Sequence, residues 1–165
     1  MKSHAQLGKY LKMGEGIERK GIKFYKSALR RVVDMNSKSL LKFLIGEEEK
    51  HLKYFLYLEK RHIDGKKLPL LKKLKNPVFR KDIYKKVSKK DLVTYDLFST
   101  ALDIETKSIN LYMKLSKKVK PKQLKKFLIM LAGREKGHYK LIKTHQDTLY
   151  ESLYWEGIVR RPIEA

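Results

Sequence analysis

The chain contains no cysteine. This absence excludes disulfides, thiolate-bound zinc, iron–sulfur clusters and cysteine nucleophiles. Any metal site must therefore be built from histidine and carboxylate side chains. Proline is also scarce, with four residues among 165, which leaves long stretches free to form uninterrupted helices.

Long apolar runs are absent as well. The runs that exist, such as residues 127–132, are far shorter than the ~20 residues that a membrane-spanning helix requires. The first residues lead into an amphipathic pattern without the apolar core of a signal peptide. We therefore expect a cytoplasmic protein with no membrane partner.

Acidic residues are few, with 18 Asp and Glu against 40 Lys and Arg, and the net charge is +22. Such a charge attracts polyanions without any dedicated site. However, most of the basic residues are lysines spread along every segment, whereas phosphate-reading surfaces favour arginine forks or clustered stripes. We expect a solvated lysine surface that binds nucleic acid only weakly and non-specifically, and a true polyanion partner is the alternative.

The length fits a single domain spanning 1–165, and 42% of the residues are hydrophobic, enough for a folded core. Apolar residues recur at steps of three, four and seven, which is the period of an amphipathic helix. The pattern predicts helices over 3–33, 38–62, 90–118 and 121–154. Residues 64–90 hold two prolines and eleven basic residues without sustained periodicity. The predicted fold is an all-α four-helix bundle with one long crossover between helices two and three.

The two halves of the chain repeat each other. A shift of 87 positions places Glu18 on Glu105 and Tyr25 on Tyr112, and without any gap it also places Glu48 on Glu135 and His51 on His138. Each half thus carries a Glu followed seven residues later by Tyr on its first helix, and a Glu-x-x-His on its second. We interpret this as an internal duplication of a helical hairpin, about 3–62 and 90–154.

The repeated residues predict a dinuclear metal site. Residues three apart project from one face of a helix, so both Glu-x-x-His pairs can reach one cavity. The glutamates of the other two helices lie among apolar positions, where an unpaired carboxylate is strongly unfavourable. Two divalent cations would neutralise four such carboxylates, with the imidazoles as neutral ligands. Hard oxygen and imidazole donors suit iron, or else manganese. The predicted ligands are Glu18, Glu48, His51, Glu105, Glu135 and His138.

A third Glu-x-x-His serves as an internal control. Glu59 and His62 have the same spacing, but the upstream position holds Leu29, and neither residue is repeated in the second half. We expect this tetrad to be a solvated helix end. Two matched tetrads with matched upstream glutamates are much harder to attribute to chance.

Several residues near the predicted ligands allow both a structural and a functional interpretation. Tyr25 and Tyr112 lie about 20° around the helix from their glutamates, so each is either a hydrogen-bond donor to a ligand carboxylate or simply core. Glu15 is read as a polar flank, and His145 as a satisfied core histidine rather than a proton relay. The glycines at 46 and 133 suggest close helix approach.

The paired Glu-x6-Tyr and Glu-x-x-His motifs resemble the ferritin-like superfamily, and its rubrerythrin branch most closely. The resemblance covers nearly the whole chain. It implies that Glu18 and Glu105 are terminal ligands, that Glu48 and Glu135 bridge two irons, and that His51 and His138 each bind one iron. It also implies a homodimer.

The chain departs from rubrerythrins in two ways. It lacks their cysteine-ligated rubredoxin domain, and Ser108 stands where they carry an extra carboxylate. The expected activity is therefore a di-iron oxidoreductase that reduces hydrogen peroxide or oxygen, in oxidative-stress defence, with electrons from a separate donor protein. The alternatives are a ferroxidase or iron-handling protein, a di-iron hydroxylase acting on RNA, and a nucleic-acid-binding bundle with a structural metal site.

Overall fold

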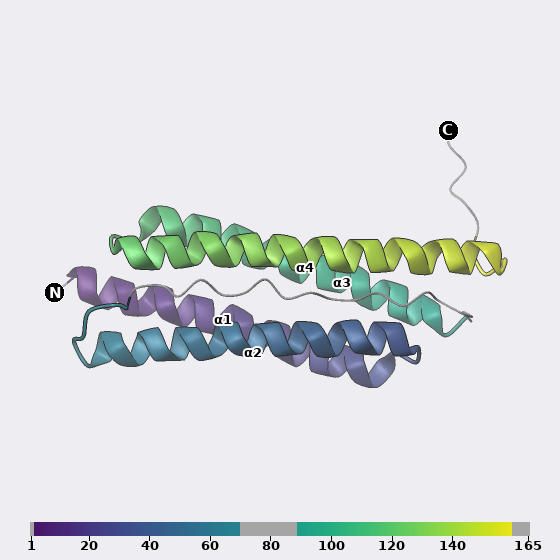
Figure 1. Ribbon diagram of the computed structural model, residues 1–165, viewed down its shortest axis with the longest axis horizontal. Coiled ribbons are helices and arrows are strands. Elements are labelled where there is room, and N and C mark those ends of the chain that lie inside the picture. Colours follow the sequence, from purple (N-terminus) through teal and green to yellow (C-terminus); the bar gives the residue numbers. More distant parts are fainter. Residues whose placement is uncertain (1, 70–88, 160–165) are drawn as a thin grey trace.

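Four long helices form an antiparallel bundle (Figure 1). The computed structural model describes residues 2–69 and 89–159. The helices are α1 (Lys2–Arg31), α2 (Met35–Ile63), α3 (Asp91–Lys118) and α4 (Lys122–Trp155), and no strand occurs in the described part of the chain. The predicted all-α four-helix bundle is confirmed. None of the helices within these residues is both long enough and apolar enough to cross a membrane.

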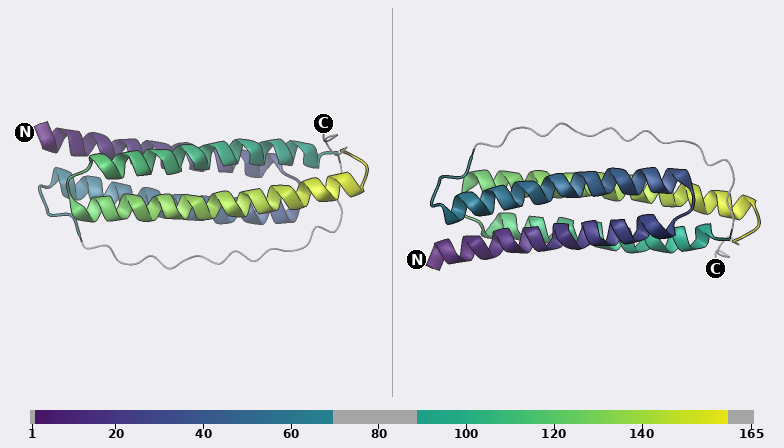
Figure 2. Two further views of the ribbon diagram at one scale, coloured as in Figure 1. Left: turned by 90° about the horizontal axis from the view of Figure 1, so that it is seen from above. Right: turned by 90° about the horizontal axis from the view of Figure 1, so that it is seen from below.

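The two predicted hairpins pack side by side. α1 packs along α2, and α3 packs along α4, while α1 and α3 meet at a second interface (Figure 2). The end of α2 and the start of α3 lie at opposite ends of the bundle, so α2 and α3 run in the same direction (Figure 1). This arrangement is the single-crossover connectivity that the sequence predicts. Most of the predicted connection over 64–90 lies outside the described residues.

The helix boundaries follow local capping chemistry. α2 begins three residues earlier than the predicted 38 because the side chain of Asp34 accepts a hydrogen bond from the backbone N–H of Ser37 at 2.7 Å. At the other end of α2, Gly65 adopts φ of +66°, a left-handed conformation that glycine reaches without strain. Ser88 and Asp91 also have a spacing that resembles a capping box, but Ser88 lies outside the described residues, and Lys90 occupies the N-cap position of α3.

Apolar side chains form two large clusters, one toward each end of the bundle. One contains Leu11, Phe55 and Phe127, and the other contains Leu44 and Phe98. The two repeats fill this core with different residues. The ring of Phe55 occupies the space that a Cβ at Gly14 would need, whereas the matching positions 101 and 142 hold Ala and Ile. A large residue on one helix is thus compensated by a small one on its neighbour.

Two predictions about packing are wrong. A Cβ added at Gly46 or Gly133 would meet nothing within 4 Å, so these glycines do not mark a close helix approach. His62 is not solvated but only 8% exposed, and its ring lies next to Gly8 of α1. Glu59 forms an ion pair of 2.8 Å with Lys12. The reason is that α1 extends far enough to cover the end of α2, which periodicity within α2 alone does not reveal.

Candidate metal centre

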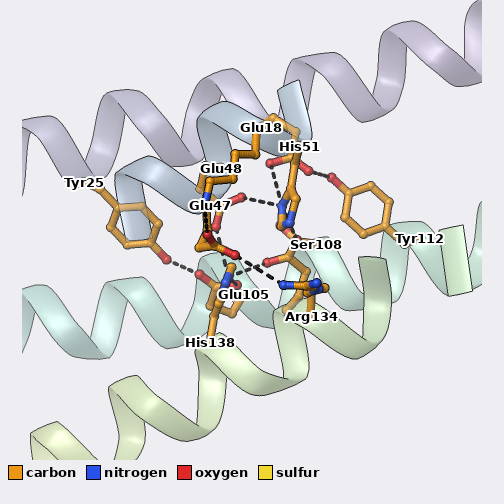
Figure 3. A network of polar contacts seen from close by, with 12 residues as sticks. Glu18, Tyr25, Glu47, Glu48, His51, Glu105, Ser108, Tyr112, Arg134 and His138 are labelled. Atoms are coloured by element: carbon orange, nitrogen blue, oxygen red, sulfur yellow. Dashed lines mark hydrogen bonds and ion pairs between the residues drawn. The ribbon is translucent and has the colours of Figure 1, made fainter. Parts of the chain in front are cut away.

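The six predicted ligands meet in the middle of the bundle, between the two apolar clusters. Figure 3 shows Glu18, Glu48, His51, Glu105 and His138 turned toward one another. Each of the four helices contributes at least one of them, and none of the six residues is more than 4% exposed. They are Glu18 from α1, Glu48 and His51 from α2, Glu105 from α3, and Glu135 and His138 from α4. A buried group of four carboxylates without compensation would be strongly unfavourable.

The ligand atoms fall into two overlapping groups. One group joins Glu18 and His51 to Glu48 and Glu135, and the other joins Glu105 and His138 to the same two glutamates. Within each group the candidate donor atoms all lie within 4.8 Å of one another. Each group could hold one metal ion, and the two ions would share Glu48 and Glu135.

The contacts of the imidazoles show how the sharing is arranged. His51 Nδ1 lies 3.3 Å from Glu48 Oε2 and 3.2 Å from Glu135 Oε1. His138 Nδ1 lies 3.2 Å from Glu48 Oε1 and 3.0 Å from Glu135 Oε2. Each of these two glutamates therefore turns one oxygen toward each histidine, which is the arrangement of a carboxylate that bridges two ions.

The other two glutamates each face one histidine. Glu18 Oε2 lies 3.7 Å from His51 Nδ1, and Glu105 Oε2 lies 3.8 Å from His138 Nδ1. Their position at the two ends of the cluster is that of terminal ligands. The rings of His51 and His138 stack with centroids 5.8 Å apart and planes inclined by 20°.

The two tyrosines bond across the bundle rather than within their own helices. The hydroxyl of Tyr25 on α1 donates to Glu105 on α3, and the hydroxyl of Tyr112 on α3 donates to Glu18 on α1 (Figure 3). Both tyrosines are fully buried. Of the two interpretations that the sequence left open, both tyrosines are therefore hydrogen-bond donors to candidate ligands. The exchange ties α1 to α3 and holds each terminal carboxylate in one orientation.

The electrostatics divide the carboxylates into two kinds. Burial raises the pKa of Glu18 and of Glu105 well above the ordinary carboxyl value, and the nearby charge of Glu48 adds to the rise. Burial also acts to raise the pKa of Glu48 and of Glu135, but their contacts with both histidines outweigh it and lower the pKa of each.

The histidines show the complementary effect. Burial lowers the pKa of His51 and of His138, but contacts with three carboxylates around each ring outweigh burial and raise the pKa well above the ordinary value. These pKa directions favour protonation of both imidazoles and of the carboxyl groups of Glu18 and Glu105 in the metal-free protein. Two divalent cations would supply the same positive charge and displace those protons.

The donor atoms fit a pair of metal ions. Among the described residues, Glu105 Oε2 and Glu135 Oε1 are buried side-chain oxygens that accept no hydrogen bond of good geometry. Buried polar atoms normally have a partner, and a bound ion can be that partner where no hydrogen bond is made. Both oxygens point toward a histidine Nδ1 within the predicted ligand groups. Oxygen and imidazole donors of this kind suit iron or manganese.

The remaining candidates lie outside these groups. Glu15 accepts a hydrogen bond from Arg19 at 2.8 Å, as a polar flank would. His145 is buried, and its Nε2 lies 2.9 Å from the hydroxyl of Ser37. Ser108 donates to the backbone carbonyl of Ile104. The Glu59 and His62 tetrad takes no part in the groups.

A buried ion pair that lies beside the cluster was not predicted from the sequence. Glu47 Oε2 lies 3.4 Å from a guanidinium nitrogen of Arg134, and the two side chains are 5% and 9% exposed. They precede the two shared glutamates in sequence and are related by the same shift of 87 positions. The shift of 87 positions could have identified the pair. A search for identical residues in the two halves does not find it, because one position holds Glu and the other holds Arg.

Comparisons with known proteins support the fold. No protein-family model matches the chain, and no curated protein matches it. Among solved structures, the chain is similar to a hypothetical protein from Pyrococcus furiosus, with 26% sequence identity and a TM-score of 0.67. The match covers 88% of this chain and 90% of the other. It indicates that the fold of most of this chain occurs in another protein.

Proposed function

We propose that the chain is a carboxylate-bridged di-iron oxidoreductase of the rubrerythrin type, which reduces hydrogen peroxide or oxygen. The observation that carries the proposal is the pair of ligand groups that share Glu48 and Glu135. A single structural metal ion would need only one such group. Two ions that share two carboxylates lie roughly 3.5–4 Å apart in known two-metal sites.

The ligand count leaves room for a small substrate. Each ion would take one terminal glutamate, one histidine and an oxygen from each of two bridging glutamates. Four protein ligands leave coordination positions open on ions that commonly take more. The iron pair would supply the redox chemistry, and the protein would supply binding, orientation and protection from solvent.

The chain's own residues would fix the reacting geometry. The tyrosine hydroxyls orient the terminal carboxylates, and the two apolar clusters limit water around them. The chain has no cysteine, so it carries no iron–sulfur relay. Electrons would come from a separate donor protein.

Metal analysis followed by a peroxide assay tests the proposal. After anaerobic loading with iron(II), we expect two ions per chain and peroxide consumption that depends on an external reductant. Glu48→Ala and Glu135→Ala should each lower both the iron content and the rate. Glu49→Ala is the matched control, because this neighbour of Glu48 is exposed and pairs only with Lys26 among the contacts observed. At most one ion per chain would refute the dinuclear site.

The same assay separates the alternatives. A ferroxidase would oxidise and accumulate added iron(II) without turnover by an external reductant. Binding of two irons with neither peroxide consumption nor oxygen consumption in the presence of reductant would leave the site standing and refute the oxidoreductase.

A further inference from the structure

The candidate metal centre is closed, because none of its six candidate ligand residues is more than 4% exposed. Metal ions that load the folded protein must therefore pass between two helices. The helices within each hairpin pack closely along their length, and two tyrosine hydroxyls tie α1 to α3. The backbones of α2 and α4 approach each other at few positions. Of the four sides of the bundle in the described residues, this one, which we call the seam, has the fewest close backbone approaches.

The contacts across the seam form an ordered series. The ring of Tyr54 packs on Phe127 with centroids 4.4 Å apart, and the ring of Phe43 meets His138 at 6.4 Å. Between these aromatic contacts lies the ion pair of Glu47 and Arg134. The pair is therefore the polar part of a seam that is otherwise aromatic on either side.

The pair also lies over the middle of the centre. The contacts between the repeats are reciprocal, because Tyr25 bonds Glu105 and Tyr112 bonds Glu18, so an approximate twofold axis relates the two repeats. Glu47 and Arg134 are equivalent positions of the repeats, and equivalent positions that touch each other lie near this pseudo-twofold axis. Their neighbours in sequence are the shared ligands Glu48 and Glu135. Figure 3 shows Glu47 and Arg134 beside the ligand cluster, joined to each other.

We infer that the Glu47 and Arg134 pair is the gate through which divalent cations reach the centre. The guanidinium of Arg134 repels an incoming cation and must move aside, whereas the carboxylate of Glu47 attracts the cation and receives it first. The other oxygen of Glu47 is held by Lys50 Nζ at 2.5 Å, and the side chain of Lys50 is 66% exposed. A cation arriving from solvent would replace first the ammonium group of Lys50 and then the guanidinium of Arg134 as the partner of Glu47. The inference rests on the proposed metal centre.

The gate predicts opposite effects for its two members. Arg134→Gln removes the barrier and should speed metal uptake by at least tenfold. Glu47→Gln removes the receiving charge and leaves the guanidinium in place, so uptake should slow by at least tenfold. Both variants break a buried ion pair and should lose stability, so a change that merely loosened the bundle would shift both rates in the same direction.

Stopped-flow mixing of the metal-free protein with cobalt(II), followed by the visible absorption of the bound ion, measures the rate and the final stoichiometry. Arg134→Lys retains the positive charge and should load at close to the wild-type rate. Asp147→Asn is the control, because it breaks an exposed ion pair of the same helix, with Lys143, and should change nothing. Thermal unfolding of each metal-free variant verifies that it is folded.

The cobalt stoichiometry tests the metal centre, and the loading rates test the gate, so the two proposals can be refuted independently. Fewer than two cobalt ions in the wild type at saturation would refute the proposed centre. Two ions in every variant, with equal rates or with rates that shift in the same direction for Arg134→Gln and Glu47→Gln, would refute the gate and leave the centre intact.

Discussion

Replacing His138 with alanine should remove about half of the stability that metal binding adds, whereas replacing His62 should remove none of it. His138 Nδ1 lies 3.0–3.8 Å from three carboxylates of one ligand group. His62 is nearly as buried, at 8% exposure, but it belongs to neither group. Both substitutions remove a buried imidazole, but only His138→Ala removes a candidate ligand.

The expected magnitude follows from linkage. An ion present at a thousand times its dissociation constant stabilises the folded state by about 4.1 kcal/mol, so two ions contribute about 8 kcal/mol. For a chain of this size, one kcal/mol corresponds to about 2–4 °C in Tm. Metal should therefore raise the Tm of the wild type by about 16–32 °C. His138→Ala takes one ligand from one of the two ions, and its rise should be about 8–16 °C.

The assay compares each protein with itself, by calorimetry with and without metal. His62→Ala leaves a small cavity against α1 and should cost about 1–3 kcal/mol, but it should cost the same in both states. Its metal-dependent rise should therefore equal that of the wild type. Equal rises for His138→Ala and His62→Ala would refute the assignment of the ligands. His51→Ala should behave like His138→Ala, because the two positions are related by the repeat.

Three further predictions concern the surroundings of the centre. Tyr25→Phe and Tyr112→Phe should each weaken metal binding by about 10–100-fold, because each removes a donor to a terminal ligand; unchanged affinity in a calorimetric titration would show that the hydroxyls do not matter. The metal-free native state should bind more protons than the unfolded chain above about pH 6.5, the ordinary histidine pKa, because the pKa values of both site histidines are raised. Stability of the metal-free protein, measured by urea unfolding, should thus fall as the pH rises above this value, and a rise would contradict the charge assignment. Binding to RNA or DNA should be weak and lost steeply with salt in a filter-binding assay, and sub-micromolar binding with base preference at physiological salt would favour the RNA hydroxylase.

The fold and the convergence of the six candidate ligands could be predicted because both depend on spacing along single helices. The period of the apolar residues determines which positions face inward, and Glu48 with His51 face inward together for the same reason. The shift of 87 positions then predicts that Glu135 and His138 do likewise on the second hairpin. Four carboxylates that all face the interior lie near the bundle axis, and the structure brings them to the same level along it.

Contacts between helices could not be predicted in the same way. The seven-residue spacing places Tyr25 near Glu18, yet the hydroxyl bonds Glu105 on another helix. A tyrosine side chain is long enough to cross the bundle, and which carboxylate it reaches depends on the stagger between α1 and α3. The burial of His62 has the same origin, because it depends on how far α1 extends along the end of α2.

The ion pair of Glu47 and Arg134 is a second kind of contact that the identical residues of the repeat do not reveal. Repeated positions that lie away from the pseudo-twofold axis can keep the same residue in both halves, as the six ligands do. A position on the axis touches its own equivalent, and two equal charges there would repel each other in a buried site. One copy must therefore change sign or lose its charge. A duplicated chain is thus expected to differ between its halves at the axis, so a Glu in one repeat opposite an Arg in the other marks where the two halves touch beside the candidate metal centre.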